Sequence, residues 1–391
     1  PLVERLRGQG VTVEVLPMSD DARRLRRGRV GADLPARAVL GSLRYAGRLA
    51  RRLQQLDVDL VHTNTLKAAL YGGLAGRLAG VPVVWHVQDR IAPDYLPRPA
   101  VALVRALARV LPSAVVANSA TTLATVRRRP APRDAVVAPP LDPGIHQPRL
   151  ISPAAGGASS SPAGPGRPLT VGIVGRLAPW KGQDLFLRAF AAAFPEAEVQ
   201  ARIVGSALFG EDAWGERLRP LATSLGLDSR VEFVGFTDDV AGEYAQMDVL
   251  VHASTVPEPF GQVIVEGMAA GLAVVAADAG GPAEIISDGV DGLLYPIGDA
   301  DALANRLRQL VADPALRARL GEAAQERAQD FTPEHAARNV EQVYRSVMRR
   351  RRPRLPGLRR HPATARARRG EAADHLKGGS QSPRRFVSRS S

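Results

Sequence analysis

The sequence contains no cysteine, so a disulfide framework and a thiolate metal site are both excluded. No apolar run approaches the roughly 18 residues that a membrane-spanning helix needs, and no charged start leads into an apolar signal segment. These absences suit a reducing compartment. We therefore expect a cytoplasmic protein, with the inner face of the membrane as an alternative location.

Acidic residues are scarce in residues 349–391, which hold thirteen arginines and one lysine against Glu371 and Asp374. This stretch accounts for +12 of the formal net charge of +13, so the rest of the chain is almost neutral. We expect a disordered basic tail, and its single aromatic residue argues against base stacking on nucleic acid. An anionic membrane surface is the better candidate partner, because residues 23–52 also carry many arginines among apolar residues.

Short β-branched runs alternate with longer helical stretches in two successive sets. This pattern predicts an α/β fold with two doubly wound, Rossmann-like domains facing a cleft. The first domain covers residues 1–141, and the second covers residues 169–330. A linker rich in Pro, Gly and Ser joins them at residues 142–168, and a final amphipathic helix is expected at residues 331–348.

The strands of both domains can be placed from their apolar runs. In the first domain they are expected at 11–16, 58–62, 82–87 and 114–118. In the second they are expected at 169–174, 200–204, 231–234, 248–252, 273–277 and 292–295. The chain begins at Pro1, inside an expected helix, so we expect the true N-terminus and the first strand of the first sheet to be missing.

The most informative segment is EPFGQVIVEG at residues 258–267. A proline and a glycine break the chain, and a helix is expected from Gln262 to Ala270. Free N–H groups at a helix start can bind phosphate or sugar oxygens. Glu258 stands just before them, and Glu266 lies about two turns along, within reach of a ribose. A capped core helix with two surface carboxylates would give the same pattern, and these residues alone leave both interpretations open.

A second segment, GRLAPWKG at residues 175–182, directly follows an expected strand. Its two cations, Arg176 and Lys181, suit a pyrophosphate leaving group, whose developing charge must be neutralised. Only three of the 52 basic residues are lysines, so a lysine in this loop indicates a function that requires a compact ammonium group. Two solvated surface cations are the alternative interpretation.

Together these segments resemble the GT-B retaining glycosyltransferases of family 4, glycosyl transferases group 1. The matching motifs are Gly175-Arg176 with Lys181-Gly182, then Gly235-Phe236, the seven-residue gap between Glu258 and Glu266, and GGPAE at residues 280–284. The resemblance covers roughly residues 10–348 and is strongest in the second domain. It implies transfer of a hexose from a nucleotide-diphosphate sugar to an unidentified acceptor, with no metal and no cofactor, in bacterial cell-surface glycan or glycolipid synthesis.

The resemblance also implies a role for each matching residue. The catalytic residues would be Arg176, Lys181, Glu258 and His86. The substrate-binding residues would be Gly175, Phe236, Thr237, Phe260, Gly261, Gln262, Val263 and Glu266. Of these, Phe236 and Thr237 would lie along the base, and Glu266 would bind the ribose hydroxyls.

His86 lies in VWHVQD at residues 84–89, at the end of an expected strand. A lone histidine there is more often packed or solvated than a ligand, but the resemblance implies that it lines the donor sugar. His62 ends a similar strand and is a looser match for the same cleft.

Retention by double displacement needs a carboxylate nucleophile near the anomeric carbon. Glu258 is the only candidate, and the resemblance gives it contacts with sugar hydroxyls instead. We therefore favour a same-face substitution in which the departing phosphate helps to deprotonate the acceptor.

The chain departs from the family at its start, because the opening strand and its Gly-rich loop are absent. We therefore expect this chain to be poorly active. A non-catalytic nucleotide-sugar-binding protein is the alternative that this missing start suggests. A GT-B nucleotide-sugar epimerase is a second alternative, because it could share the fold and the diphosphate site.

Overall fold

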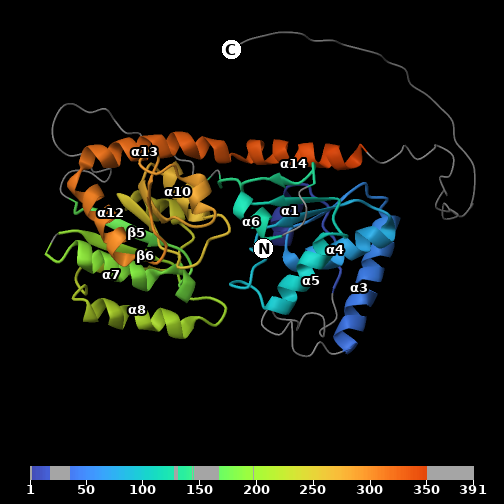
Figure 1. Ribbon diagram of the computed structural model, residues 1–391, viewed down its shortest axis with the longest axis horizontal. Helices are drawn as coiled ribbons and strands as arrows, with labels where there is room; N and C mark the ends of the chain where they lie inside the picture. The colour runs from blue at the N-terminus through green and yellow to red at the C-terminus, as the bar shows by residue number, and fades with distance from the viewer. Residues whose placement is uncertain are drawn as a thin grey trace, which may run out of the picture. The chain divides into compact units, whose positions relative to one another are not determined.

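The computed structural model describes residues 2–17, 36–126, 131–142, 144, 167–196 and 198–349 (Figure 1). Most of the expected linker, the expected basic tail beyond Arg349, and residues 18–35 lie outside this part of the chain. The described residues form an α/β fold with two parallel sheets. The fold class is therefore confirmed.

The second sheet has six parallel strands, and each matches an expected strand within a residue. They are β5 (Thr170–Val174), β6 (Gln200–Val204), β7 (Val231–Gly235), β8 (Val249–His252), β9 (Ala273–Ala277) and β10 (Leu293–Tyr295). Their order is β10-β9-β8-β5-β6-β7. The chain therefore runs outward from β5 in one direction and from β8 in the other, which makes the β5/β8 boundary the switch point of the sheet.

Helices cover both faces of this sheet. They are α7 (Gln183–Ala193), α8 (Asp212–Ser224), α9 (Val240–Ala245), α10 (Gln262–Ala269), α11 (Pro282–Ile285), α12 (Ala300–Ala312) and α13 (Pro314–Ala328). Side chains along β8 alternate between the two cores, because Val249 and Val251 pack with α7 and α12 while Leu250 packs with α10. Burial on both faces explains why these strands read as unbroken apolar runs.

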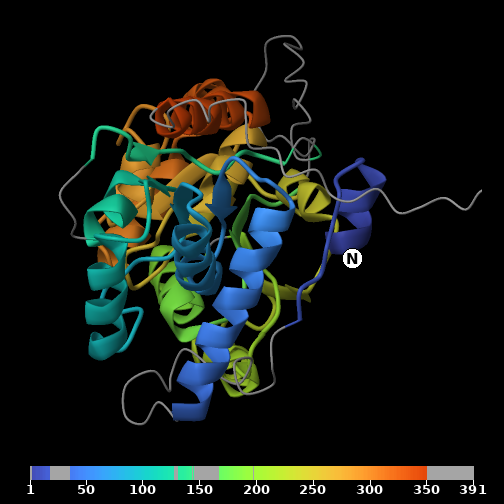
Figure 2. The same cartoon turned by 90° about the vertical axis from the view of Figure 1, so that its right-hand side faces the viewer.

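The first sheet has four parallel strands in the order β1-β2-β3-β4. They are β1 (Val61–Thr63), β2 (Val83–Val87), β3 (Ala114–Ala117) and β4 (Ala135–Val136), and the last of these was not predicted. The helices are α1 (Leu2–Gly8), α3 (Ala36–Gln55), α4 (Leu66–Ala79), α5 (Arg98–Ala108) and α6 (Ala120–Thr125). Helix α3 packs beside α4 (Figure 2). The rings of Tyr45 and Tyr71 meet edge to face between these helices.

The strand expected at residues 11–16 is wrong, because the structure gives that segment no strand pairing. Val11 and Val15 are 48% and 66% exposed, so the alternating apolar residues of this segment do not form a buried face.

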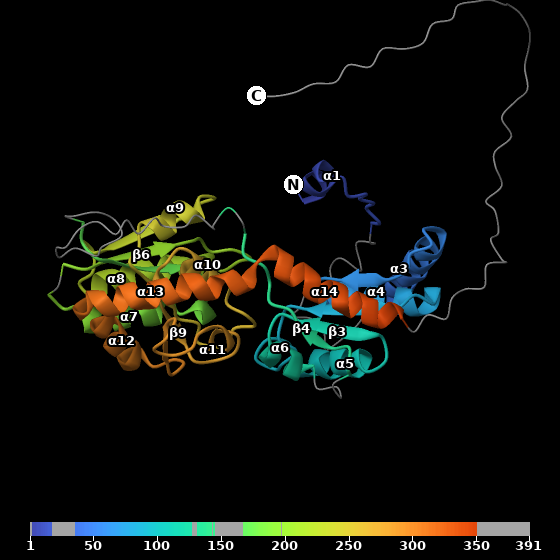
Figure 3. The same ribbon diagram turned by 90° about the horizontal axis from the view of Figure 1, so that it is seen from above.

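The last helix, α14 (Pro333–Met348), packs on the first sheet and not on the second (Figure 3). It begins two residues later than expected, where the Thr332 side chain accepts a hydrogen bond from the His335 N–H. Val343 and Val347 on its buried face join the core beneath β2 and β3. The sequence predicts the helix and its amphipathic character, but not the sheet that it covers.

Candidate active site

The expected cationic loop and the expected acidic segment meet at the switch point of the second sheet. The loop leaves β5 through Gly175 and contains a short 3-10 helix, η2 (Pro179–Lys181). It touches the loop after β8 at Gly182, where an added Cβ would lie 1.9 Å from the Ala253 carbonyl oxygen. With a φ of +72° as well, this position requires glycine. Open α/β sheets bind ligands at this type of boundary.

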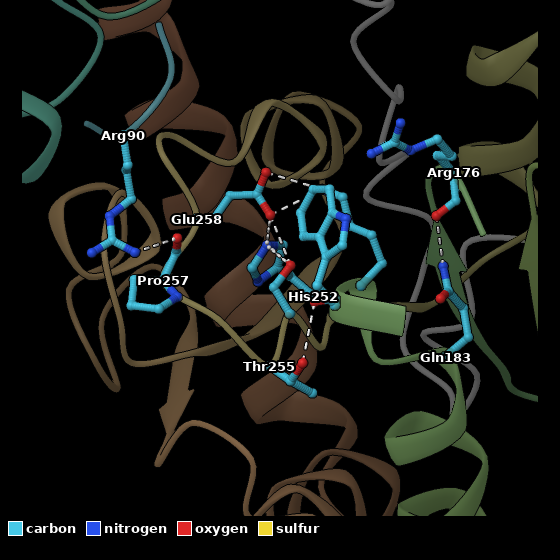
Figure 4. A network of polar contacts seen from close by, with 10 residues as sticks. Arg90, Arg176, Gln183, His252, Thr255, Pro257 and Glu258 are labelled. Carbon is cyan, nitrogen blue, oxygen red and sulfur yellow. Dashed lines mark hydrogen bonds and ion pairs between the residues drawn. The ribbon is translucent and has the colours of Figure 1, made fainter. Parts of the chain in front are cut away.

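Glu258 lies at the centre of the site (Figure 4), where it pairs with Lys181. The Lys181 ammonium donates to both carboxylate oxygens, at 3.0 Å and 2.9 Å, and the two side chains are only 19% and 12% exposed. The Ser254 hydroxyl donates to Oε2 at 2.7 Å, and His252 Nε2 lies 3.4 Å from the same oxygen. The carboxylate is therefore fixed in position by one cation and two polar neighbours.

The surroundings of Glu258 decide its charge. Burial alone would raise the pKa of this carboxyl, but the hydrogen bond from His252 and the positive charge of Lys181 outweigh it and lower the pKa to about 2. The group is thus ionised at neutral pH, and it can accept hydrogen bonds from hydroxyl groups of a ligand.

Arg176 is held differently from Lys181. Its guanidinium carbon lies 5.5 Å from the centre of the Trp180 ring and 5.1 Å from the centre of the Phe209 ring. Among the described residues, no carboxylate pairs with it. Its main-chain oxygen accepts a hydrogen bond from the buried Gln183 amide, which fixes the backbone beneath it. A cation whose charge is not neutralised can bind an anion at this edge of the sheet.

Helix α10 begins beside this pair. Gly261, with a φ of +110°, precedes its first turn, and no side chain caps the helix there. Phe260, just before this turn, is buried and packs against Phe331. The first N–H groups, at Gln262 and Val263, are those that the sequence analysis expects to bind phosphate.

Glu266 lies on α10 and is bound by a buried tyrosine. The Tyr244 hydroxyl donates to its Oε2 at 2.7 Å. Burial raises the pKa of Glu266 even though this hydrogen bond acts in the opposite direction.

Phe236 and Thr237 follow β7, two strands away from β5. Phe236 is 68% exposed, and the Thr237 hydroxyl accepts a hydrogen bond from the Asp239 N–H. Their expected place along a nucleotide base stays a prediction.

His86 and His62 lie together, but a third residue that the sequence does not indicate joins them. His62 Nε2 lies 3.2 Å from His86 Nδ1, and its other nitrogen lies 2.8 Å from the Tyr344 hydroxyl of α14. Burial, with a further contribution from His62, lowers the pKa of His86 to about 4, and burial lowers the pKa of His62. Both rings are thus neutral at pH 7. The expected contact of His86 with a donor sugar stays a prediction.

The backbone around Glu258 is held from two directions. The Gly281 N–H donates to the Glu258 carbonyl at 2.9 Å. From the other side, the hydroxyls of Ser119 and Thr122, at the start of α6, donate to the Pro259 carbonyl at 2.6 Å and 3.1 Å. The sequence analysis missed these hydroxyls, because the contacts join residues about 140 positions apart.

Glu284, the last residue of the GGPAE motif, also binds the start of α6. Its carboxylate accepts hydrogen bonds from the N–H groups of Ala120 and Thr121, both at 2.7 Å. Arg90, after β2, donates to the Pro257 carbonyl at 3.2 Å (Figure 4). Groups from the first sheet therefore border the acidic segment.

The sequence analysis also missed three residues beside the expected site. His252 and Ser254, two residues apart at the end of β8, could have been found as polar groups closing a buried strand. Phe209 carries no such signal, because a lone aromatic residue in a loop is uninformative.

Two parallel sheets of this order, with paired charges at a switch point, define the architecture of a GT-B transferase. The family profile for Glycosyl transferases group 1 matches residues 160–327, and that for Glycosyltransferase Family 4 matches residues 2–143. A D-inositol 3-phosphate glycosyltransferase of Nocardioides sp. is 32% identical over 314 residues, covering 73% of this chain and 67% of the relative. The chain belongs to this glycosyltransferase family.

Two further similarities bear on the site. The structure of Anabaena Alr3699/HepE in complex with UDP and glucose has a TM-score of 0.70 and 30% identity, covering 89% of each chain. The lipopolysaccharide core biosynthesis glycosyltransferase LpsE of Rhizobium meliloti is 41% identical over 131 residues. That match spans 33% of this chain and only 38% of the relative.

Proposed function

We propose that this chain transfers a hexose from a nucleotide-diphosphate sugar to an acceptor, with retention of anomeric configuration and without a metal ion. The observation that carries the proposal is the charge arrangement at the β5/β8 switch point. Arg176 has no acidic partner among the described residues, whereas the Lys181 ammonium is held by a hydrogen bond of 2.9 Å to the Glu258 carboxylate. Such a site suits a ligand with a negative diphosphate and hydroxyl groups.

Each residue takes a role that its environment suits. Arg176 and Lys181 hold the diphosphate, with the free N–H groups at the start of α10 adding to the cradle. The ionised Glu258 accepts hydrogen bonds from donor-sugar hydroxyls, and Glu266 accepts them from the ribose. The remaining contacts come from Gly175, from the backbone of Phe260 and Gly261, and from Phe236, Thr237 and His86.

The proposed step is a same-face substitution. The bond between the anomeric carbon and the phosphate oxygen breaks, and its electron pair stays on the diphosphate. The acceptor oxygen forms the new bond on the same face and gives its proton to the departing phosphate oxygen. Arg176 and Lys181 stabilise the charge that develops on the leaving group. Glu258 is hydrogen-bonded and ionised, which suits sugar binding.

The donor to test first is a uridine diphosphate sugar. Structures of Alr3699/HepE with 31% and 33% identity to this chain contain UDP-glucose and UDP. The names of the relatives point to lipopolysaccharide and inositol phosphate acceptors for those proteins. We therefore propose a glycan, lipid or small-molecule acceptor, within bacterial cell-surface glycan or glycolipid synthesis.

The test replaces both Arg176 and Lys181 by alanine. UDP-glucose binding, measured by calorimetry, should weaken at least tenfold, because two charge-assisted contacts are lost. Arg188→Ala, an exposed arginine on α7, is the matched control and should bind as the native chain does. Unchanged affinity in the double variant would contradict the proposal. Product analysis by NMR must show a retained anomeric configuration, and epimerised donor formed without acceptor would indicate the epimerase instead.

We further propose that the protein works in the cytoplasm, on the inner face of the membrane. Helix α3 contains five arginines and no acidic residue, and its Leu40 and Leu43 are about half exposed. Such a helix, together with the basic residues 349–391, suits an anionic lipid surface. Within the described residues, no helix has the length and apolar character needed to cross a bilayer. Deleting residues 349–391 should reduce sedimentation with phosphatidylglycerol vesicles and leave UDP binding unchanged.

A further inference from the structure

Phe209, in the loop between β6 and α8, has an exposed apolar side chain and an unfavourable backbone conformation. At 89% exposure it is more exposed than any other large apolar side chain that the structure describes. Its backbone also has a φ of +62°, in the left-handed region that bulky side chains rarely adopt. Both features are unfavourable for folding, so the position calls for a functional reason.

The loop that carries Phe209 is tied to the cationic loop after β5. The Leu177 N–H donates to the Ser206 carbonyl at 3.0 Å, and Leu177 forms a bridge with Ala207. At Gly205 an added Cβ would lie 2.1 Å from the Gly175 carbonyl oxygen, so the two backbones pass in direct contact. Phe209 is therefore brought beside Arg176 by backbone structure and not by chance contact of two exposed side chains.

The contact that results is a cation near two aromatic rings. The Phe209 ring centre lies 5.1 Å from the Arg176 guanidinium carbon, and the Trp180 ring centre lies 5.5 Å from it. Trp180 also lies 4.4 Å from the Lys181 ammonium, so one ring serves both cations. An aromatic ring attracts a cation without neutralising its charge, so Arg176 keeps its full charge for an anionic ligand.

We propose that Phe209 is a positioning residue, whose ring holds the Arg176 guanidinium ready for the donor diphosphate. The inference rests on the proposed function and deepens it, because it explains how one of the two cations is kept in place without an acid.

The experiment measures UDP and inorganic pyrophosphate binding by calorimetry, together with the KM for the donor and kcat. Phe209→Leu keeps apolar bulk and removes the aromatic face. It should weaken binding of both probes about 2- to 5-fold, the effect expected of an exposed cation–π contact. Phe209→Tyr restores the face and should bind as the native chain does. Leu208→Ala, which trims the neighbouring exposed side chain, is the matched control and should also be unchanged.

A change in folding is separated from a change in positioning by a fourth variant and by a double-mutant cycle. Phe209→Gly relieves the unfavourable φ, so it should unfold at the same or a higher temperature than the native chain and still bind UDP less tightly. With Arg176 replaced by alanine, Phe209→Leu should have no further effect.

Three results would overturn the inference. Native affinity in Phe209→Leu, or an equal loss from that substitution with and without Arg176, would refute it while leaving the diphosphate site intact. Unchanged UDP affinity in Arg176→Ala alone would overturn it together with the proposed role of Arg176.

Discussion

Glu258→Gln should change how the stability of the protein depends on pH. The pKa of this carboxyl falls from 4.5 to about 2 on folding, because His252 and Lys181 outweigh the effect of burial. A shift of about 2.5 units corresponds to roughly 3 kcal/mol at pH 7, at about 1.36 kcal/mol per unit. Since the folded-state pKa is the lower one, this stability is fully present above pH 4.5 and is lost as the pH falls through about 2.

The size of the change at an accessible pH follows from the same two pKa values. At pH 3 the ionised carboxylate still contributes about 1 kcal/mol. Glutamine does not titrate, so the free-energy difference between the native chain and Glu258→Gln should narrow by about 2 kcal/mol between pH 7 and pH 3. Urea denaturation at both pH values, followed by tryptophan fluorescence, measures this difference.

The control for this experiment is Glu341→Gln. The Glu341 carboxylate pairs with Arg345 one helical turn away and is 57% exposed. Such a pair contributes only a few tenths of a kcal/mol to stability. The difference in unfolding free energy between the native chain and Glu341→Gln should therefore barely change with pH. If the difference in unfolding free energy between the native chain and Glu258→Gln were the same at pH 7 and pH 3, the electrostatic account of the site would be refuted.

Three further predictions concern packing, pH and the contact with α6. Gly182→Ala should destabilise the protein by more than about 3 kcal/mol, seen as a large fall in Tm, because its Cβ would collide with the Ala253 carbonyl; an unchanged Tm would contradict the close approach of the two loops. The free energy of unfolding should fall as the pH drops from 6.5 to 4, because His86 takes up a proton in the unfolded chain but not in the folded one. His86→Gln should reduce this fall. An unchanged dependence of the unfolding free energy on pH would show that the ring is not buried. Glu284→Ala should cost about 1 kcal/mol of unfolding free energy, because two backbone N–H groups lose their acceptor; Glu284→Gln should recover part of it.

The strands of the second sheet could be predicted almost to the residue because each is a short apolar run between Gly, Pro or charged residues. Residues 200–204 and 273–277 have the bounds that the sequence predicts. The same rule failed at residues 11–16, where β-branched residues alternate as in a strand but no neighbouring strand pairs with them. Strand formation depends on a partner, and a local pattern contains no information about one.

The charged residues of the site were predictable in kind but not in their pairing. Residue types and their place after a strand made Arg176, Lys181 and Glu258 candidates, and only the family resemblance gave them roles. The bidentate contact of lysine with glutamate depends on a fold that brings residues 77 positions apart together. The aromatic support of Arg176 depends on a backbone angle at Phe209 that no residue pattern indicates.

Helix α14 is made by the last part of the described chain, yet it completes the core of the first sheet through Val343 and Val347. No single cut can therefore separate the molecule into two self-sufficient halves. A fragment ending at the linker would leave Val84 and Val116 uncovered, and it should aggregate unless α14 is supplied in trans. Any chimera that replaces the first domain should therefore replace α14 together with it.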